Sequence, residues 1–257
     1  SKTVRFHDIN YQQAQEEDRQ AIFGGWCGIL NFFQPDVHVQ FSFMNTQVNE
    51  AEFEKSLIIP HQNDGFDHVR DEFSSVLLRQ VTKGNNALQR SKYITFSIEA
   101  ESVRAAKTRL EQIELQLLNH LKRLGVQAES LDGKERLQLM HGMMHMDEPQ
   151  TPFLFDWKWL PSTGLSTKDF IAPSSLYFKD SHRFMIGKKM ATVSFMNILA
   201  SELDDRVLVD FLSMQTTQVI TMHVQSLDHV EAIKLVQRKL SDINRSKIDE
   251  QKKAVRS

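Results

Sequence analysis

Two histidines near the middle of the chain have the spacing best suited to metal chemistry. His141 and His145 are four residues apart, so a helix would place both on one face, and Asp147 and Glu148 follow closely. Zinc proteases use H-E-x-x-H, in which the glutamate is the general base. Gly142 occupies that position here. Two interpretations follow, a metal-dependent hydrolase using His141 and His145, or two histidines packed beneath a neighbouring segment, and the missing base favours the second.

Nucleotide and thiol chemistry have weaker support. A phosphate loop needs GxxxxGK followed by Ser or Thr, because backbone amides cradle the phosphates while the hydroxyl holds magnesium. Gly133-Lys134 and Gly187-Lys188 are each followed by a charged residue, and no glycine stands five residues before either pair. The single cysteine, Cys27, has no cationic residue beside it that would favour a thiolate. We therefore expect no catalytic residue, cofactor or metal within these 257 residues.

An aromatic run follows the histidines. Phe153, Phe155, Trp157 and Trp159 alternate strictly, which predicts a strand with all four on one side. Phe153 and Phe155 suit a core, whereas two tryptophans before a Pro-Ser-Thr-Gly loop also suit a docking surface, because aromatic residues dominate interface anchors. The stripe can therefore belong either to the protein core or to a docking surface. Phe170, in the GLSTKDF stretch that follows, joins the two tryptophans as a candidate docking residue.

The C-terminal helix expected from Asp228 onward is rich in basic residues. Its last turns include Lys252 and Lys253, which we count among the candidate docking residues. A solvated helix face is the ordinary explanation, and attraction to anionic lipid or to an acidic protein surface is the functional one. A third hypothesis combines this helix with exposed aromatics in a module that binds single-stranded DNA.

These residues must be positioned by alternating strands and helices. Period-two alternation predicts strands, and stripes at three- and four-residue steps predict amphipathic helices. Asp132 with Glu135, and Asp228 with Glu231, have the spacing of helix-capping pairs. The expected strands cover residues 3–9, 37–45, 92–100, 190–198 and 218–225, with hairpin arms at 176–179 and 183–187, and the expected helices cover 10–33, 66–84, 103–125, 132–146, 201–212 and 228 onward.

The elements predict an α+β protein with two lobes. Residues 1–150 carry 16 Lys and Arg against 21 Asp and Glu, whereas residues 151–257 carry 15 against 12, and Pro149 and Pro152 mark the boundary. TVRFHDI at the start of the chain resembles TVSFMNI at residues 192–198. We therefore expect mixed or antiparallel sheets packed with long amphipathic helices and built from repeated βαβ-type, ferredoxin-like units.

Composition excludes several classes of protein. The net charge of −2 gives no strong signal for direct nucleic-acid binding, which needs clustered Lys and Arg. One cysteine rules out a disulfide framework. No stretch approaches the roughly 18 apolar residues of a membrane-spanning helix. These features predict a cytoplasmic protein.

The chain resembles a known family over most of its length. The distinctive stretches include SKYITFSIEA, HMDEPQTPFLFDWKWL and GLSTKDFIAPSS. They are similar to the N-terminal half of the large conjugation ATPase of type IV secretion systems, in the TrsE-like group of Gram-positive conjugative elements. The resemblance implies a motor that powers DNA transfer at the cytoplasmic face of the membrane, with ATP and magnesium bound in a C-terminal RecA-like domain.

No catalytic residue of that family maps onto this sequence, because no Walker A motif is present. The start without methionine and the end at KKAVRS lead us to expect a fragment, with the last helix leading toward a motor domain. The resemblance then implies a non-catalytic assembly and docking domain. Its partners would be inner-membrane components of the secretion system and other copies of the ATPase.

Overall fold

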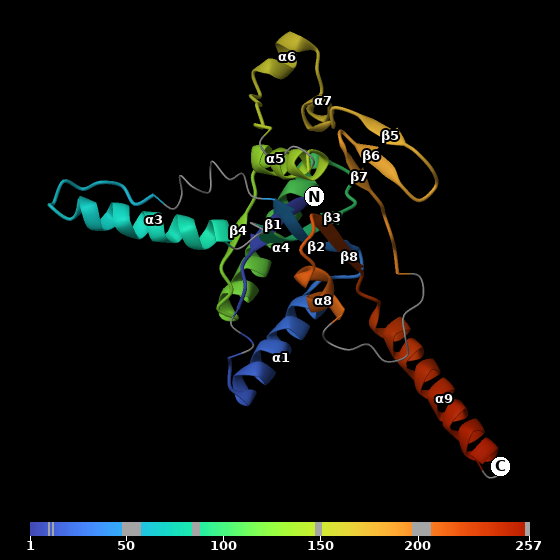
Figure 1. Ribbon diagram of the computed structural model, residues 1–257. Helices are drawn as coiled ribbons and strands as arrows, with labels where there is room; N and C mark the ends of the chain where they lie inside the picture. Colours follow the sequence, from blue (N-terminus) through green and yellow to red (C-terminus); the bar gives the residue numbers. More distant parts are fainter. Residues whose placement is uncertain are drawn as a thin grey trace.

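The protein folds into an α+β structure, which confirms the predicted class (Figure 1). The structure is a computed structural model that describes residues 1–9, 11, 13–47, 58–83, 88–146, 151–196 and 207–254, without the side chains of residues 80–83, 207–208 and 246–254. Its elements are β1 (Lys2–Phe6), α1 (Glu16–Phe32), β2 (Val37–Gln47), α3 (Asp67–Lys83), β3 (Leu88–Ile98), α4 (Val103–Arg123), β4 (Ala128–Ser130), α5 (Gly133–Met144), α6 (Trp159–Thr163), α7 (Thr167–Ile171), β5 (Leu176–Phe178), β6 (Phe184–Ile186), β7 (Lys189–Ala191), α8 (Val207–Ser213), β8 (Gln218–Val224) and α9 (His229–Ala254).

A five-stranded antiparallel sheet is the centre of the fold. Its strand order is β4-β1-β3-β2-β8. Four of its strands and two helices follow one another along the chain in the order β1-α1-β2-β3-α4-β4, with α3 inserted between β2 and β3. This βαββαβ order is that of a ferredoxin-like unit. The predicted repeat of this unit is not confirmed: the described part of the second half contains no second sheet of this order.

The core lies on one face of this sheet. Alternate residues of the strands, among them Val4, Ile94 and Phe96, are completely buried there. Helices α1 and α4 cover this face, contributing Ile29 and Leu117, which are also completely inaccessible to solvent. Because antiparallel sheets need only one covered face, this layer of two helices is sufficient to make a stable unit.

Local sequence explains where α4 begins and ends. The Ser102 hydroxyl accepts a hydrogen bond from the Ala105 backbone N–H at 3.2 Å and so caps the first turn. The helix closes at Gly125, whose positive φ of 75° suits glycine, and Val126 N–H returns to the Leu121 carbonyl at 3.0 Å. These caps fix the register of the apolar stripe that packs on the sheet.

Of the three glycines in α1, Gly25 serves packing. A Cβ placed on Gly25 would come within 2.2 Å of Leu124 Cδ2, so the absence of a side chain allows α1 and the end of α4 to approach closely. Gly24 and Gly28 have no such neighbour. Cys27, between them, is half-buried.

The opposite face of the sheet is polar and carries α5. The capping box expected of Asp132 and Glu135 is formed, with each side chain accepting from the other residue's backbone N–H. A shallow cavity lies between α5 and the sheet. It is lined by the sheet residues Thr3, Gln40, Ser42, Tyr93, Thr95 and Ser97 and by Arg136, Leu139, Met140 and Met143 of α5.

Most of the strands and helices expected from periodicity are present, with two exceptions. The strand expected at residues 190–198 is limited to β7, which ends at Ala191, and residues 192–196 are irregular. The aromatic strand expected around residues 153–159 is not formed either. The predicted boundary at Pro149 and the remainder of the TVSFMNI segment lie outside the described residues.

The second half of the chain contributes to both sheets. Strands β5, β6 and β7 form a small antiparallel sheet, which includes the predicted hairpin. Strand β8 instead pairs with β2, from Val224 opposite Val39 to Gln218 opposite Asn45. The buried Asn45 side chain also donates to the Leu212 carbonyl of α8 at 2.9 Å. The central sheet therefore joins residues from both sides of position 150.

Two helices project from this body in different directions. Figure 1 shows α3 extending to one side, and α9 extending away from the opposite side toward the C-terminus. Within the described residues, no helix combines the length and the apolar character that crossing a membrane requires.

The position of α4 makes a matched pair of substitutions informative. Leu117→Ala should lower the free energy of unfolding by about 2–5 kcal/mol, because it leaves a cavity beneath the sheet. Leu115→Ala, two residues away in the same helix, should change it by less than about 0.5 kcal/mol, because Leu115 is 62% exposed whereas Leu117 is fully buried. Denaturant unfolding of both variants measures the difference, and equal losses would contradict the packing described.

Candidate docking surface

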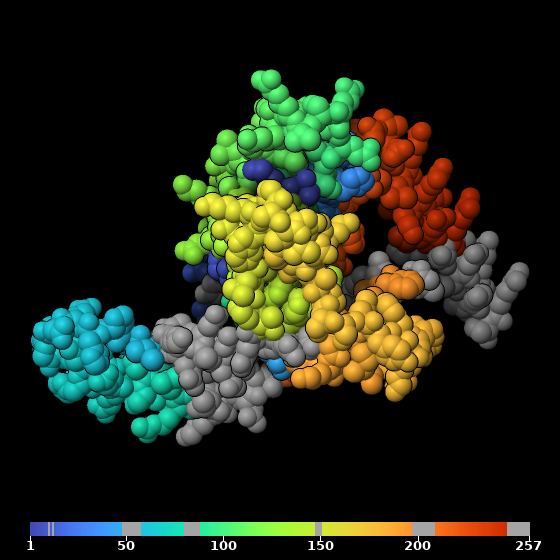
Figure 2. Space-filling view, turned by 90° about the horizontal axis from the view of Figure 1, so that it is seen from above, coloured from blue at the N-terminus to red at the C-terminus, as the bar shows by residue number. Residues whose placement is uncertain are grey.

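The aromatic run forms a compact segment over α5. Residues 151–158 are irregular, and the chain then makes two short helices, α6 and α7, the second of which packs against α5. Seen from above in Figure 2, this segment, in yellow, lies in the middle of the exposed face. The predicted strand is therefore wrong, because the segment pairs its rings with one another and with α5 and has no strand partner.

A continuous chain of ring contacts holds the segment in place. Phe155 is its centre, with ring centroids 4.9 Å from Trp157 and 5.1 Å from Phe170, both edge-on. Phe153 stacks on Phe155 at 5.7 Å, and Trp159 stacks on Phe170 at 6.4 Å. Aromatic pairs of this kind contribute about 0.5–1.5 kcal/mol each beyond the area that they bury.

The buried centre supports an exposed apolar rim. Phe155 is buried, whereas Trp157 and Trp159 are 51% and 44% exposed. Leu154 and Leu165 of the same segment are also exposed, and Phe170, whose ring contacts those of Phe155 and Trp159, is half-buried. We call this surface the aromatic patch, and it comprises Leu154, Trp157, Trp159, Leu165 and Phe170.

Polar contacts fix the turns that carry the patch. Gly164 ends α6 with a positive φ of 69°, and the Ser166 and Asp169 side chains form a capping box at the start of α7. Asp169 accepts from the Ser166 backbone N–H at 2.7 Å and from its hydroxyl at 2.8 Å. The Ser166 N–H bond is the main cause of the lowered pKa of Asp169. The carboxylate is therefore held in its charged form as a fixed part of the turn.

The two histidines support the aromatic segment and show no ligand geometry. Their rings stack with centroids 3.9 Å apart, and His141 also meets the Phe153 ring at 5.2 Å. The His145 ring Nδ1 lies 2.9 Å from the His141 carbonyl oxygen, so one ring nitrogen faces the backbone. Asp147 and Glu148 lie outside the described residues. No group of three or more His, Cys, Asp or Glu able to hold a metal occurs in the part of the chain that is described.

The structure brings three of the five candidate docking residues together. Trp157, Trp159 and Phe170 form the aromatic patch. Lys252 and Lys253 belong to α9, which lies on another side of the molecule in both views (Figures 1 and 2), and their side chains lie outside the described residues.

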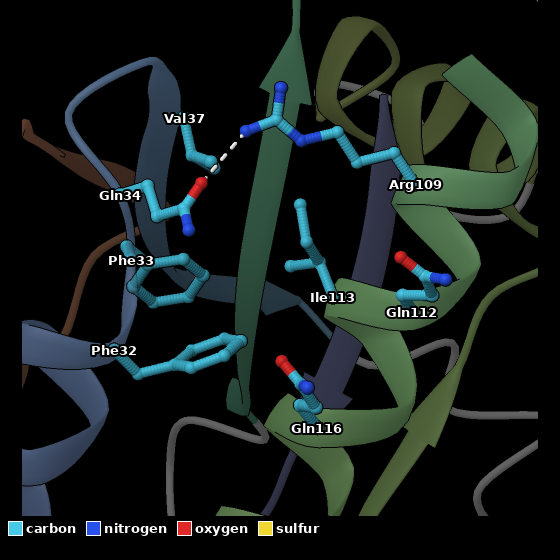
Figure 3. Close-up of a pocket in the computed structure, with 8 residues that line it drawn as sticks. All are labelled: Phe32, Phe33, Gln34, Val37, Arg109, Gln112, Ile113 and Gln116. Atoms are coloured by element: carbon cyan, nitrogen blue, oxygen red, sulfur yellow. Dashed lines mark hydrogen bonds between the residues drawn. The ribbon is translucent and has the colours of Figure 1, made fainter. Parts of the chain in front are cut away.

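A separate pocket lies between the end of α1 and helix α4 (Figure 3). It has a volume of about 220 Å³ and contains a single charged side chain, Arg109. The Arg109 guanidinium donates to Gln34 Oε1 at 3.0 Å and pairs with Asp36 at 2.5 Å. Its remaining lining residues are Phe32, Phe33, Val37, Gln112, Ile113 and Gln116. The one charge of the lining is therefore already paired, with Gln34 and with Asp36, and the other lining residues carry apolar or amide side chains.

Sequence reasoning missed the supporting residues of the patch. Leu154 and Leu165 add exposed apolar side chains to the same segment, and the His141 ring contacts the Phe153 ring. The four-residue spacing of His141 and His145 predicts that both lie on one helix face and pack against the same neighbouring segment. Nothing in the order of residues indicates that this neighbour is the aromatic segment.

Comparisons with known proteins leave the family open. No protein-family model matches the chain, and no curated protein matches it significantly.

The buried histidine predicts a pH-dependent stability. Burial, together with the neighbouring His145, lowers the pKa of His141. The folded protein therefore takes up this proton less readily than the unfolded chain, whose histidines titrate near about pH 6.5. Stability should be complete above that pH and fall as the pH drops below it.

Thermal unfolding between about pH 5 and 7 measures this effect. His141→Gln should flatten the dependence, whereas His182→Gln, at an exposed site, should leave it unchanged. An unchanged slope in His141→Gln would show that this histidine is not responsible.

Proposed function

We propose that this chain is a docking domain of a type IV secretion ATPase that powers conjugative DNA transfer. The observation that carries the proposal is the aromatic patch, which exposes two tryptophans on a packed ring cluster. Tryptophan is among the residues most enriched at interface hot spots, and exposed apolar patches mark interaction sites. The family resemblance of the sequence supplies the class of partner, inner-membrane components of the secretion channel.

The proposed mechanism is binding without chemistry in these residues. The patch contacts a channel protein at the cytoplasmic face of the membrane and so positions the motor. ATP and magnesium act in the RecA-like domain that the resemblance implies. Neighbouring copies of the ATPase are the second class of partner, through surfaces other than the patch.

The architecture is compatible with this role. The patch stands on α5, which is itself seated on the central sheet, so its residues are held in one arrangement before any partner binds. Preorganisation of this kind raises affinity, because fewer side chains must be ordered on association.

Removing the patch tryptophans tests the docking role directly. Trp157→Ser with Trp159→Ser should weaken binding to inner-membrane components of the secretion system by at least about 100-fold, because hot-spot anchors contribute about 2 kcal/mol or more each. Binding to each detergent-solubilised protein would be measured by biolayer interferometry.

The matched control is Tyr177→Ser with Phe178→Ser, since both are aromatic residues of the small sheet that are more exposed, at 64% and 68%, than the two tryptophans. This control should bind normally, and circular dichroism would verify that both variants are folded. Equal binding by the tryptophan variant and the unmodified chain would refute the assignment of the patch.

The absence of a phosphate-loop sequence gives an independent prediction. The 257-residue chain should show no magnesium-dependent ATP hydrolysis and no saturable nucleotide binding by calorimetry. Clear turnover would overturn the non-catalytic role.

A further inference from the structure

Helices α3 and α9 expose apolar stripes with the same spacing. The α3 stripe consists of Phe66, which immediately precedes the helix, and Val69, Phe73 and Val76 within it. The α9 stripe consists of Ile233, Val236, Leu240 and Ile243. Both follow steps of three, four and three residues, which is the a and d spacing of helices that pack along a shared seam. With a rise of about 1.5 Å per residue, each stripe is about 15 Å long.

Neither stripe has a cover in the described part of the chain. The four α3 residues are 43–63% exposed, and the four α9 residues are 44–56% exposed. Neither helix packs extensively on another described helix or strand. In both views the two helices project from opposite sides of the body (Figures 1 and 2), so they cannot meet within one molecule.

The two stripe segments carry opposite charge, although α3 as a whole, with three acidic and three basic residues, is balanced. Residues 66–76, which span the α3 stripe, contain three acidic residues and one basic residue, whereas residues 233–243, which span the α9 stripe, contain three basic residues and one acidic residue. Helix α9 contains seven Lys and Arg against four Asp and Glu. Two copies of α9 would repel each other, as would two copies of residues 66–76, whereas the mixed pair attracts.

We propose that α3 of one copy of this chain binds α9 of a second copy, with the two helices antiparallel and their apolar stripes forming the seam. The contact rests on the proposed association of neighbouring copies and names the surfaces that it would use; because it uses none of the aromatic patch, it can be tested separately from binding at the patch. Because each copy offers α3 on one side and α9 on the other, the contact is head-to-tail. It generates a closed ring or an open filament rather than a symmetric dimer.

One pair of charges selects the antiparallel orientation. In that orientation Phe66 faces Ile243 and Val76 faces Ile233. Glu72 and Lys239 then both flank the middle of the seam, on the same side, and face each other. Neither side chain has a hydrogen bond or ion pair among the described residues, and both are exposed. A parallel arrangement would instead place Glu72 near Asn244, with no opposite charge.

The α3 stripe is already held in a fixed conformation. Arg70 pairs with Asp67 at 2.8 Å and also with Asp64, which ties the preceding loop to the helix. The buried Ser74 hydroxyl accepts from the Ile59 backbone N–H at 3.2 Å on the same side. The loop thus covers one face of α3 and leaves the apolar stripe free for the second copy.

Charge reversal tests the pairing. The 257-residue chain should associate in sedimentation velocity at concentrations up to about 100 µM, since a two-heptad seam gives weak binding. Glu72→Lys and Lys239→Glu should each raise the concentration for half-association about tenfold, because like charges then face each other. The double variant should return to within about threefold of the original. A double variant that fails to recover, or single variants without effect, would refute the proposed register.

Mixing two blocked variants distinguishes this contact from self-pairing. Phe73→Asp disables only the α3 stripe, and Leu240→Asp disables only the α9 stripe; both residues are exposed, so the fold should be kept. Each variant alone should be monomeric, whereas an equimolar mixture should form a 1:1 dimer that grows no further. Association of Phe73→Asp by itself would mean that α9 pairs with α9, and a monomeric mixture would overturn the proposal. Normal binding of channel proteins by both variants would show that the aromatic patch acts independently.

Discussion

The structure depends on covering one apolar face of the central sheet. Ile94 and Phe96 from the middle strand, with Val4 beside them, are fully buried beneath Leu117 and Leu121 of α4. Each fully buried side chain of this size contributes about 1.5–3 kcal/mol. No other described part of the chain has a comparable set of buried apolar residues, so the βαββαβ unit is the foundation on which the remaining elements are placed.

The same constraint explains why so much apolar surface is left exposed elsewhere. Once α1 and α4 cover one face, the other face needs no apolar layer, and its Ser and Thr side chains can pair with one another, as Thr3 and Thr95 do at 3.0 Å. Helix α5 rests on that face and carries the aromatic segment outward. The α3 insertion and α9 leave the unit at its margins, so their apolar stripes have no core to join.

Local sequence signals predicted the elements well because each element satisfies its own period and caps. Helix α4 shows its stripe, its Ser102 cap and its Gly125 stop directly in the sequence, and α5 shows its capping box. The alternating residues of β2 and β3 predicted both strands, although successive residues such as Tyr93 and Ile94 are buried in the structure. These features depend on neighbours in the sequence, so they can be predicted without knowledge of tertiary contacts.

The errors arise where a distant partner decides the outcome. The alternation of Phe153 to Trp159 predicted a strand. A strand needs a neighbouring strand to pair its backbone N–H and C=O groups, whereas this segment packs its rings on α5 and on one another. Pro161 is accommodated in the first turn of α6, where its missing N–H is unneeded. Strand β8 was predicted as a strand, yet its place beside β2, more than 170 residues earlier, depends on a pairing that no local pattern encodes.

The aromatic patch and the α3 stripe differ from an irregular exposed loop because other residues hold them in place. Trp157 and Trp159 rest on a ring cluster that reaches a buried residue, Phe155, and α3 is clamped to its loop by Arg70. Ordering such residues on binding costs little, because their conformations are already selected in the free molecule. Large apolar side chains that stay exposed are unfavourably hydrated, and this free energy is recovered only when a partner covers them. The combination of exposure and rigidity is therefore a stronger indication of binding than exposure alone.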